Sequence, residues 1–416
     1  MPQRFSFIST ILLFASVPLF AQETPAPLDA YERAVAELQG EKFTQCKSAF
    51  SLEARQKGVS ESTITEALDG ASLLEQVIKY DRNQPEFVRT FPDYLNKRVN
   101  QWRISQGKKL LKEHYPLLQE LSAQYGIPPQ YLVSFWGLET NFGAYKGKMP
   151  IIDALVTLAC DTRRSDFFTK ELIQALLLID RENINYKEML GSWAGAMGHT
   201  QFMPSAYMQY AVDGDEDGRA DLWNSVPDAL TSAANFLSNL GWVSGYRWGR
   251  EIMLPENFDF QQTGRGISKT LSQWQDMGVT KADGSALGNV EIAASVIVPS
   301  GHKGPAFLVY DNFNVIMKWN YSEFYAIAVG HLADRIIGGG ALQQPLPELP
   351  NYSIAEVKQM QSRLNELGFE VGEADGILGP ATRKGIQGFQ IANNLVADGF
   401  PYPQIFKAIQ EAPLDI

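Results

Sequence analysis

A proline-rich stretch around residue 347 divides the chain into two very unequal parts. Gly338-Gly-Gly340 is followed by the run Gln343-Gln-Pro-Leu-Pro-Glu-Leu-Pro350. Proline fixes the backbone angle φ and lacks an N–H, so three prolines in six residues exclude a helix or a central strand and favour a stiff, extended segment. We therefore expect a large region that ends at residue 340, a linker over residues 341–351, and a small domain over residues 352–416.

The first residues have the pattern of a secretory leader. Arg4 precedes an uncharged run from Phe5 to Ala21, and a polar stretch follows. Serines and a proline interrupt this run, which is short for a membrane span of about 20 apolar residues. We expect a signal peptide over residues 1–21, a soluble exported protein that begins at residue 22, and no later membrane span. An uncleaved anchor is the alternative.

Composition excludes several classes of protein. The 416 residues include 36 Lys and Arg against 47 Asp and Glu, a formal net charge of −11, with no long basic run. Nucleic acid is therefore not an expected partner, since phosphates require clustered basic side chains. Four scattered histidines and two cysteines provide no catalytic metal-ligand pattern and no zinc ribbon. In an exported protein Cys46 and Cys160 can form a disulfide, with two buried thiols as the alternative.

Hydrophobic periodicity predicts a mainly helical large region. The helical segments are expected between Leu28 and about Gln106, between Lys109 and Leu240, and from about Ser322 to Ile337. The best strand candidates are residues 293–299 and 306–310, so the β element is small. Residues 243–304 are otherwise rich in Gly and polar side chains and are expected to form loops.

One carboxylate lies in an apolar helical segment. Residues 128–143 begin with two prolines, which suit a first helical turn, and end with Gly143, which suits a helix end. Helical spacing places Glu139 on one face with Leu132 and an aromatic side chain. Desolvation there would raise the pKa of the Glu139 carboxyl group, and a protonated carboxyl group can act as a general acid on an ether oxygen. The alternative is a helix-end glutamate that reaches solvent or pairs with a base.

Glu139 belongs to the first of three motifs that follow one another along the chain. They are Glu139-Thr-Asn-Phe-Gly143, the run Gly191-Ser-Trp-Ala-Gly-Ala-Met-Gly-His-Thr-Gln-Phe-Met-Pro-Ser205, and the segment from Asn312-Phe to Trp319-Asn-Tyr-Ser-Glu-Phe-Tyr325. In sequence and order they resemble the three signatures of the membrane-bound lytic murein transglycosylases of the B type. The resemblance covers about residues 30–338.

That resemblance implies a lysozyme-like helical core and cleavage of the bond between N-acetylmuramic acid and N-acetylglucosamine in peptidoglycan. Glu139 would protonate the glycosidic oxygen and then take the proton of the muramic C6 hydroxyl, which attacks C1 and closes a 1,6-anhydro ring. No cofactor is implied for catalysis, and no second carboxylate of the kind that ordinary glycoside hydrolases use. Asp153 and Asp161 are candidates for a second acid, with helix caps or loop acids as the alternative.

The resemblance also implies a partner and a location. The partner is the peptidoglycan glycan strand, the location is the periplasm, and we expect a monomer. Two other functions stay open: a muramidase of the same fold that admits water, and a non-catalytic wall-binding scaffold that uses the same groove.

Substrate-binding residues follow from the family's motifs. The residues assigned to this role are Arg163, Arg164, Ser192, Gln201, Trp319, Asn320 and Tyr325. Trp193 and Trp319 stand where the family often has tyrosine, which removes two phenolic hydroxyls. His199 falls at a variable family position and receives no role. A solvated surface pair is the alternative for the two arginines.

An acidic loop has the spacing of an EF-hand calcium site. Oxygen donors occupy its first, third and fifth positions, and Gly218 occupies the sixth, where a sharp turn is needed. Asn224 replaces the usual glutamate at position twelve, and the similar loop of the family suggests a later aspartate. The expected ligands of a structural Ca²⁺ or Na⁺ ion, within residues 213–228, are Asp213, Asp215, Asp217, Arg219 through its carbonyl oxygen, and Asp228. A solvated loop is the alternative.

The segment after the linker predicts three short helices. Helical spacing runs from Ile354 to Leu367, continues over residues 382–389 and ends with residues 405–409. The turn Asp375-Gly-Ile-Leu-Gly379 and the pair Phe389-Gln390 resemble elements of the three-helix peptidoglycan-binding module of cell-wall hydrolases. This resemblance implies a tethering role, with a purely structural cap as the alternative.

Overall fold

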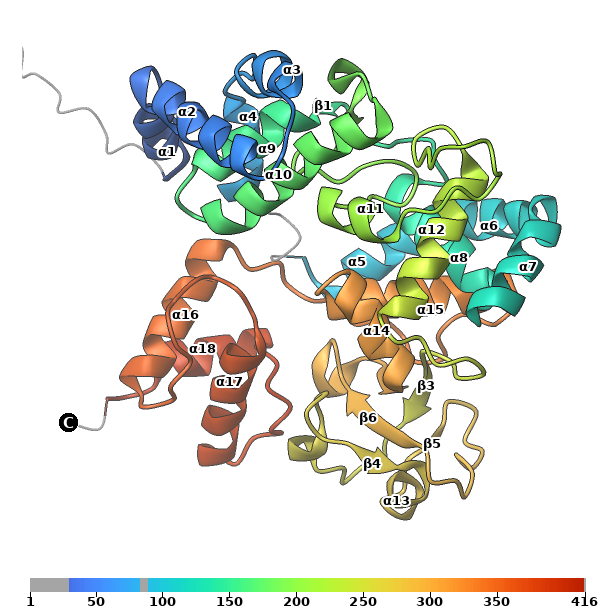
Figure 1. Cartoon of the computed structure of the whole chain (residues 1–416). Helices are drawn as coiled ribbons and strands as arrows, with labels where there is room; N and C mark the ends of the chain where they lie inside the picture. The colour runs from blue at the N-terminus through green and yellow to red at the C-terminus, as the bar shows by residue number, and fades with distance from the viewer. Residues whose placement is uncertain (1–29, 83–88, 415–416) are drawn as a thin grey trace, which may run out of the picture.

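The computed structural model describes residues 30–82 and 89–414 (Figure 1). The expected signal peptide lies outside the described residues. The described chain is mainly helical with small sheets, as the periodicity predicts. The helices before the sheet region are α1 (Ala30–Leu38), α2 (Glu41–Gln56), α3 (Glu61–Thr63), α4 (Glu75–Arg82), α5 (Phe91–Arg98), α6 (Gln101–Glu113), α7 (Tyr115–Tyr125), α8 (Pro129–Thr140), α9 (Ile151–Cys160), α10 (Ser165–Glu182), α11 (Pro204–Tyr210) and α12 (Val226–Asn239).

Two hydrophobic cores build the helical body. The first surrounds α8 and includes α5, α6, α7 and α12, together with α14 (Asp311–Trp319) and α15 (Glu323–Ile336). The second includes α2, α9, α10 and α11. Trp319, the last residue of α14, packs against both cores. The third sequence motif therefore lies at the junction of the two cores.

Helix α8 is apolar around its whole circumference because α6, α7 and α15 pack about it. From Tyr131 to Thr140 every residue is buried except Glu139, which is half-buried. The polar Ser134 is satisfied in this interior by donating to the Val329 carbonyl oxygen of α15 at 2.7 Å. The sequence predicted one apolar face, but the helix is buried on all sides, as expected of a central core helix.

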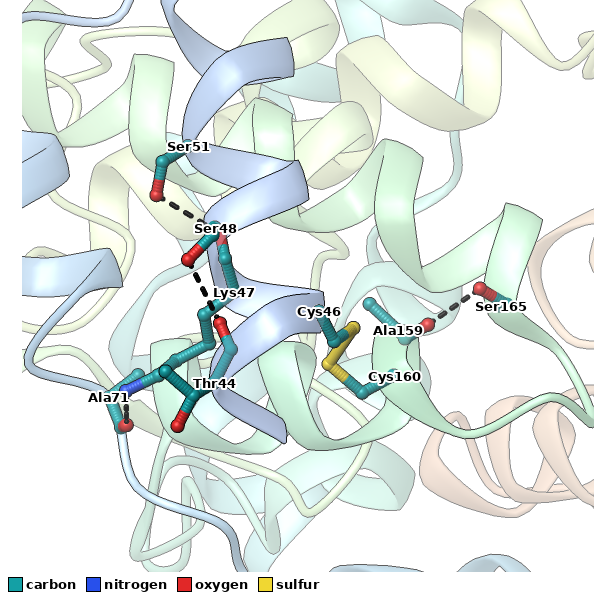
Figure 2. Close-up of a disulfide and its surroundings, with 9 residues drawn as sticks. All are labelled: Thr44, Cys46, Lys47, Ser48, Ser51, Ala71, Ala159, Cys160 and Ser165. Atoms are coloured by element: carbon teal, nitrogen blue, oxygen red, sulfur yellow. Dashed lines mark hydrogen bonds between the residues drawn. A yellow bond between two sulfur atoms is a disulfide. The ribbon is translucent and has the colours of Figure 1, made fainter. Parts of the chain in front are cut away.

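A disulfide joins two helices of the second core, α2 and α9 (Figure 2). Cys46 of α2 bonds to Cys160, the last residue of α9, with the two Cα atoms 6.0 Å apart and a sequence separation of 114. Beside it, the Ser165 hydroxyl donates to the Ala159 carbonyl oxygen at 2.6 Å. The end of α9 and the turn that follows it are therefore fixed at two points.

The chain between α12 and α14 forms a five-stranded antiparallel sheet, which lies below these two helices in the view of Figure 1. The strands, in the order β4-β6-β7-β3-β5, are β4 (Lys269–Thr270), β6 (Ala293–Ile297), β7 (Ala306–Val309), β3 (Gly249–Met253) and β5 (Thr280–Lys281). The two predicted strands are confirmed as β6 and β7, with Ser295 opposite Val309. Strand β3 and helix α13 (Leu271–Asp276) occur where loops were expected. They form because Ile252 and Trp274 supply a fully buried core beneath the polar turns.

A second, two-stranded sheet is formed by the residues just before α9 and those at the start of the second motif. Strand β1 (Met149–Pro150) pairs antiparallel with β2 (Leu190–Gly191). This pairing brings the chain that follows α8 against the beginning of the second motif.

The C-terminal module consists of three helices around its own core. They are α16 (Ile354–Glu366), α17 (Pro380–Ala392) and α18 (Pro403–Glu411), which match the three expected segments. The module contacts the sheet region. His302 Nδ1 lies 2.6 Å from Asp398 Oδ2, and the Lys303 backbone N–H donates to the Tyr402 hydroxyl at 3.0 Å.

The linker is extended, as its prolines predict, but it does not run free. The backbone N–H groups of Gln343 and Gln344 donate to the Glu251 carboxylate at 2.8 Å, and Leu346 packs on the first core. Among the described residues, no helix has the length and apolarity that a membrane crossing requires.

Candidate active site

Glu139 lies one residue before the end of α8. The sequence predicted that the helix ends at Gly143, but it ends at Thr140 because the next three residues are left-handed, with φ of 51° at Asn141, 61° at Phe142 and 81° at Gly143. Positive φ is uncommon for a bulky residue such as Phe142 and marks local backbone strain. This turn directs the chain sharply away from the acid, so that Glu139 is left at the exposed end of an otherwise buried helix.

His199 of the second motif braces this turn. The Thr140 hydroxyl donates to the His199 carbonyl oxygen at 2.7 Å, and the Gly143 backbone N–H donates to that same hydroxyl at 2.8 Å. A Cβ on Gly143 would lie 2.3 Å from the His199 ring, so the position requires glycine for space as well as for φ. The first two motifs therefore form one interlocked unit.

The His199 ring is a neutral acceptor. Trp136 Nε1 donates to His199 Nδ1 at 3.0 Å, and burial, together with the nearby Lys146 charge, lowers the pKa of His199 to about 4. Sequence comparison gave His199 no role. The one sequence signal for a role of His199 is the glycine directly before it. Gly198 adopts a φ of 70°, which glycine allows, and the chain turns there toward the end of α8.

Two donors from the third motif fix one oxygen of the acid. Trp319 Nε1 donates to Glu139 Oε1 at 3.0 Å, and the Tyr325 hydroxyl donates to the same oxygen. The indole therefore provides a hydrogen bond although the phenolic hydroxyl common in the family is missing. Burial, reinforced by the Glu139 charge, raises the pKa of Tyr325, so this phenol stays protonated and remains a donor.

Aromatic packing holds the donor in place. The Trp319 ring lies 4.7 Å from the Phe135 ring, 5.1 Å from Phe236 and 5.5 Å from Phe202, measured between ring centroids. Phe202 is buried in the second core, so it packs beneath the site. A rigid indole fixes the direction in which Glu139 points.

The second motif is a tight turn beside the acid. The Ser192 hydroxyl accepts backbone N–H bonds from Ala194 and Ala196 at 3.3 and 2.9 Å, so it shapes the turn. Gln201 Nε2 donates to the carbonyl oxygens of Lys146 and Gly198 at 3.2 and 3.0 Å. Both side chains are half-buried. The structure thus brings these two predicted site residues next to the loop that follows Glu139.

The remaining predicted contacts lie around the same junction. Asn320 is exposed directly after Trp319. Trp193 is half-buried, and its ring centroid lies 6.4 Å from that of Tyr80 of α4.

The arginine pair is anchored to a buried acid that the sequence comparison did not identify. Arg163 Nη1 lies 2.6 Å from both the carbonyl oxygen and Oδ2 of Asp81, and Arg164 Nη2 donates to Asp81 Oδ1. The pair is thus held by ion pairs to Asp81, while each of the two side chains keeps about a third of its surface in solvent. Nothing in the spacing of residue 81, more than 80 positions upstream, indicates this contact.

The two candidates for a second acid are engaged elsewhere. Asp161 Oδ1 accepts from Arg82 Nη2 at 2.6 Å, and Asp153 Oδ1 accepts from the Ser72 backbone N–H at 2.9 Å. Both carboxylates thus hold the N-terminal segment against α9. This favours the structural interpretation of these two residues.

The acidic loop brings three of its predicted ligands together. Carboxylate oxygens of Asp213, Asp215 and Asp217 lie within 4.8 Å of one another. Asp213 also accepts backbone N–H bonds from Asp217 and Gly218, which curls the loop around this cluster. Three adjacent carboxylates repel one another without a cation, and hard oxygen donors suit Ca²⁺, so the residues fit such an ion.

Asp228 is placed differently. Its side chain is fully buried at the start of α12, where it accepts backbone N–H bonds from Gly214 at 2.8 Å, Asp215 at 3.2 Å and Asp221 at 2.6 Å. Asp228 therefore braces the backbone of the loop, and it does not join the three-carboxylate cluster. Arg219 is exposed, and its side chain pairs with Asp221 at 3.4 Å.

The geometry suits acid–base chemistry with one carboxyl group. Glu139 is half-buried, rigidly oriented and accompanied by two hydrogen-bond donors, which suits a group that gives and takes a proton at one place. Two lobes of α-helices meet at this group.

Comparison with known proteins gives the family. Residues 42–334 match the family described as Transglycosylase SLT domain, and residues 353–409 match the family described as Putative peptidoglycan binding domain. The chain is 32% identical over 294 residues to the membrane-bound lytic murein transglycosylase B of Escherichia coli strain K12, which covers 67% of this chain and 79% of that protein.

Solved structures agree with this match. SltB3 from Pseudomonas aeruginosa, in complex with NAG-anhNAM-pentapeptide, has a TM-score of 0.85 at 39% identity and covers 89% of this chain and 100% of its own. Slt35 from Escherichia coli, in complex with bulgecin A, has a TM-score of 0.61 at 30% identity and covers 72% of this chain and 94% of its own. The chain belongs to the transglycosylase SLT family, with a C-terminal peptidoglycan-binding domain, and it is a lytic murein transglycosylase.

Proposed function

We propose that this enzyme cleaves the bond between N-acetylmuramic acid and N-acetylglucosamine without water and leaves 1,6-anhydro-muramic ends. The observation that carries the proposal is the single carboxyl group of Glu139, held by Trp319 and Tyr325 where the two cores meet. The structure of SltB3 in complex with NAG-anhNAM-pentapeptide, a fragment with an anhydro end, supports this product.

In the proposed reaction Glu139 acts twice. As a carboxylic acid it donates a proton to the glycosidic oxygen while the bond to C1 breaks. As a carboxylate it then takes the proton of the muramic C6 hydroxyl, whose oxygen forms the new bond to C1. The proton lost in the first step is regained in the second, so the enzyme returns to its starting state. Trp319 and Tyr325 stabilise the carboxylate between the two steps.

The substrate is held by the groups around this acid. We assign substrate contacts to Arg163, Arg164, Ser192, Gln201, Trp319, Asn320 and Tyr325. The arginines suit the lactyl or peptide carboxylates of a glycan strand, and the amide of Gln201 suits an acetamido group. Tyr325 is buried and bonded to Glu139, so its main role is to orient the acid.

We further propose a domain division and a location. The catalytic region covers residues 22–340, the linker 341–351 and the wall-binding domain 352–416, and the protein works in the periplasm after removal of residues 1–21. The C-terminal domain keeps the enzyme on the insoluble wall and so raises its local concentration there.

The acidic loop binds a structural cation, with Asp213, Asp215 and Asp217 as carboxylate ligands. A structure of Slt35 in complex with calcium supports this proposal. The ion would neutralise the three carboxylates and fix the loop before α12. It takes no part in the proton transfers.

The decisive experiment is the Glu139→Gln variant with intact sacculi as substrate. The amide has the shape of the acid but can neither donate nor accept the proton, so turnover should fall at least about a thousandfold. Sacculus binding should stay within about twofold of the unmodified enzyme.

Product masses separate the open alternatives. Ends lighter by one water than reducing ends support the proposal. Reducing ends would indicate a muramidase, and full turnover by the variant would remove Glu139 from the mechanism.

A further inference from the structure

A buried carboxylate lies between two neighbouring arginines. Asp81, near the end of α4, has a side chain that is 1% exposed, and Arg163 and Arg164 bond to its two different oxygens. Arg163 also donates to the Asp81 carbonyl oxygen at 2.6 Å. One residue of α4 thus fixes both side chains of a pair that follows α9.

Electrostatics explains why such a residue is needed. Adjacent guanidinium groups repel each other, and both would move into solvent without a negative charge between them. Asp81 supplies that charge, and the ion pair of Arg82 with Asp161 at 2.6 Å fastens the two chain segments beside it. The Arg164 guanidinium also stacks over the Phe168 ring at 4.8 Å, which fixes its plane.

The cluster keeps an excess of positive charge. Its five side chains, those of Asp81, Arg82, Asp161, Arg163 and Arg164, carry three positive and two negative charges. The Arg163 and Arg164 side chains are 38% and 36% exposed, so part of each guanidinium faces solvent. The exposed edges of these two guanidinium groups, together with the excess of positive charge, suit one further carboxylate.

The cluster borders the second motif. Tyr80, the residue before Asp81, is 43% exposed and faces Trp193, with their ring centroids 6.4 Å apart. Two consecutive residues of α4 thus contact the second motif, through Tyr80, and the arginine pair, through Asp81.

We propose that Asp81 is a positioning residue for substrate binding: it holds Arg163 and Arg164 so that their exposed edges receive a carboxylate of the glycan strand. The inference rests on the proposed function, in which the arginines contact the substrate. Asp81 itself touches neither the substrate nor Glu139 in this scheme. Its loss should therefore weaken binding of anionic glycans and leave the chemical step unchanged.

The test is the Asp81→Asn variant, assayed on soluble peptidoglycan fragments that keep their stem peptides. Asparagine keeps the shape but cannot neutralise two guanidinium groups. KM should rise about tenfold, the loss expected for one charge-assisted hydrogen bond, while kcat stays within twofold. The inhibition constant of a neutral N-acetylglucosamine oligomer, which has no carboxylate, should not change.

The matched control is Asp153→Asn, which removes a carboxylate of the same lobe that binds a backbone N–H and contacts no arginine in the described structure. It should leave KM unchanged. In a chain that already carries Arg163→Met and Arg164→Met, Asp81→Asn should add nothing to KM. If Asp81→Asn does not fold, Asp81→Glu, which keeps the charge but moves it by one methylene, should still raise KM severalfold.

Three results would overturn the proposal: an unchanged KM in a folded Asp81 variant, an equal loss for the neutral oligomer, or a fall in kcat alone. None of them would affect the proposed function. The loss of turnover in Glu139→Gln and the anhydro product masses are independent of Asp81.

Discussion

At the end of α8 one carboxylate oxygen receives hydrogen bonds from two aromatic side chains that lie 180 and 186 residues further along the chain. Such donors favour the ionised form that the acid must reach after the first proton transfer. The surrounding rings exclude water from the Trp319 side of the group. The proposed catalysis by one residue thus depends on the hydrogen bonds that Trp319 of α14 and Tyr325 of α15 donate to Glu139.

Removal of one donor should slow the chemistry without changing the fold. In Tyr325→Phe the ring still fills the core, but Glu139 loses a hydrogen bond from a buried hydroxyl. A hydrogen bond to a charged group contributes about 1.5–3 kcal/mol, so kcat should fall roughly tenfold to a hundredfold. Tyr352→Phe, which removes a hydroxyl bonded to the Pro401 carbonyl oxygen, is the matched control and should keep full activity. Equal rates for the two variants would contradict this role of Tyr325.

Two buried histidines should make stability sensitive to acid. Burial lowers the pKa of both His199 and His331 to about 4, below the ordinary value of 6.5. Between pH 6.5 and pH 4 these histidines bind protons in the unfolded chain but stay neutral in the folded chain. The free energy of unfolding therefore falls as the pH drops from about 6.5 to about 4. The loss is about 3 kcal/mol for each histidine.

Urea unfolding at pH 7 and pH 4.5 checks this expectation. His331→Gln, which cannot titrate, should lose less stability over this interval than the unmodified protein by up to about 3 kcal/mol. Carboxylates contribute equally to both proteins, so the difference isolates the histidine. Parallel pH profiles would show that His331 does not titrate in this way.

At the scale of elements, the sequence predicted the helices and strands that have a local hydrophobic pattern and missed those that depend on contacts distant in sequence. The strands β6 and β7, helix α15 and the three helices of the C-terminal module were predicted because each has its own periodicity. Strand β3 and helix α13 were missed, since their cores are completed by residues distant in sequence. The early end of α8 also required contacts with His199, which helical spacing does not reveal.

The residues of the candidate active site were likewise predicted where a sequence motif contains them and missed where only the fold brings them together. The motifs gave Glu139, Trp319 and Tyr325, and the structure places these three together. Asp81 and His199 were not found, because their roles arise from side chains that meet only after folding. Asp228 could be assigned to the loop from its position, but its three backbone bonds could not be foreseen.

The acidic loop should respond to calcium as a structural element. At a Ca²⁺ concentration one hundred times the dissociation constant, binding adds about 2.7 kcal/mol to stability, which should raise Tm by several degrees. Asp213→Asn combined with Asp215→Asn should abolish the shift, while Asp283→Asn, in a separate exposed loop, should keep it. The kcat at a fixed moderate temperature should be the same with and without the ion. A shift of equal size with Na⁺ would assign the site to that ion, and a shift that survives in the double variant would contradict the proposed ligands.

At the scale of the whole molecule, the C-terminal module is docked against the sheet region. The docking uses backbone and side-chain bonds of His302, Lys303 and Ser300 to Asp398 and Tyr402. The linker is fastened by Glu251 on the same side. The wall-binding domain therefore has a defined orientation relative to the catalytic region, so a bound strand would reach Glu139 from a preferred direction.

The His302→Ala variant should loosen this docking. It leaves the Asp398 carboxylate, whose side chain is fully buried, without a hydrogen bond from an imidazole, which costs about 1–3 kcal/mol. Limited proteolysis within residues 341–351 should become roughly tenfold faster, because cleavage follows the open population. Lys407→Ala, which removes an exposed ion pair with Glu411, should not change the rate. If both variants are cut at the same rate, the contact between His302 and Asp398 does not hold the module.

The disulfide between Cys46 and Cys160 makes the folding stability of the enzyme depend on the redox state of its compartment. The covalent ring that it closes contains α8 with Glu139, and its last member directly precedes the turn that bears Arg163 and Arg164. A crosslink across so long a loop removes much of the conformational freedom of the unfolded chain. A copy that stays in a reducing compartment would lack this constraint, so under the proposed periplasmic location the enzyme would be least stable before it leaves the cytoplasm.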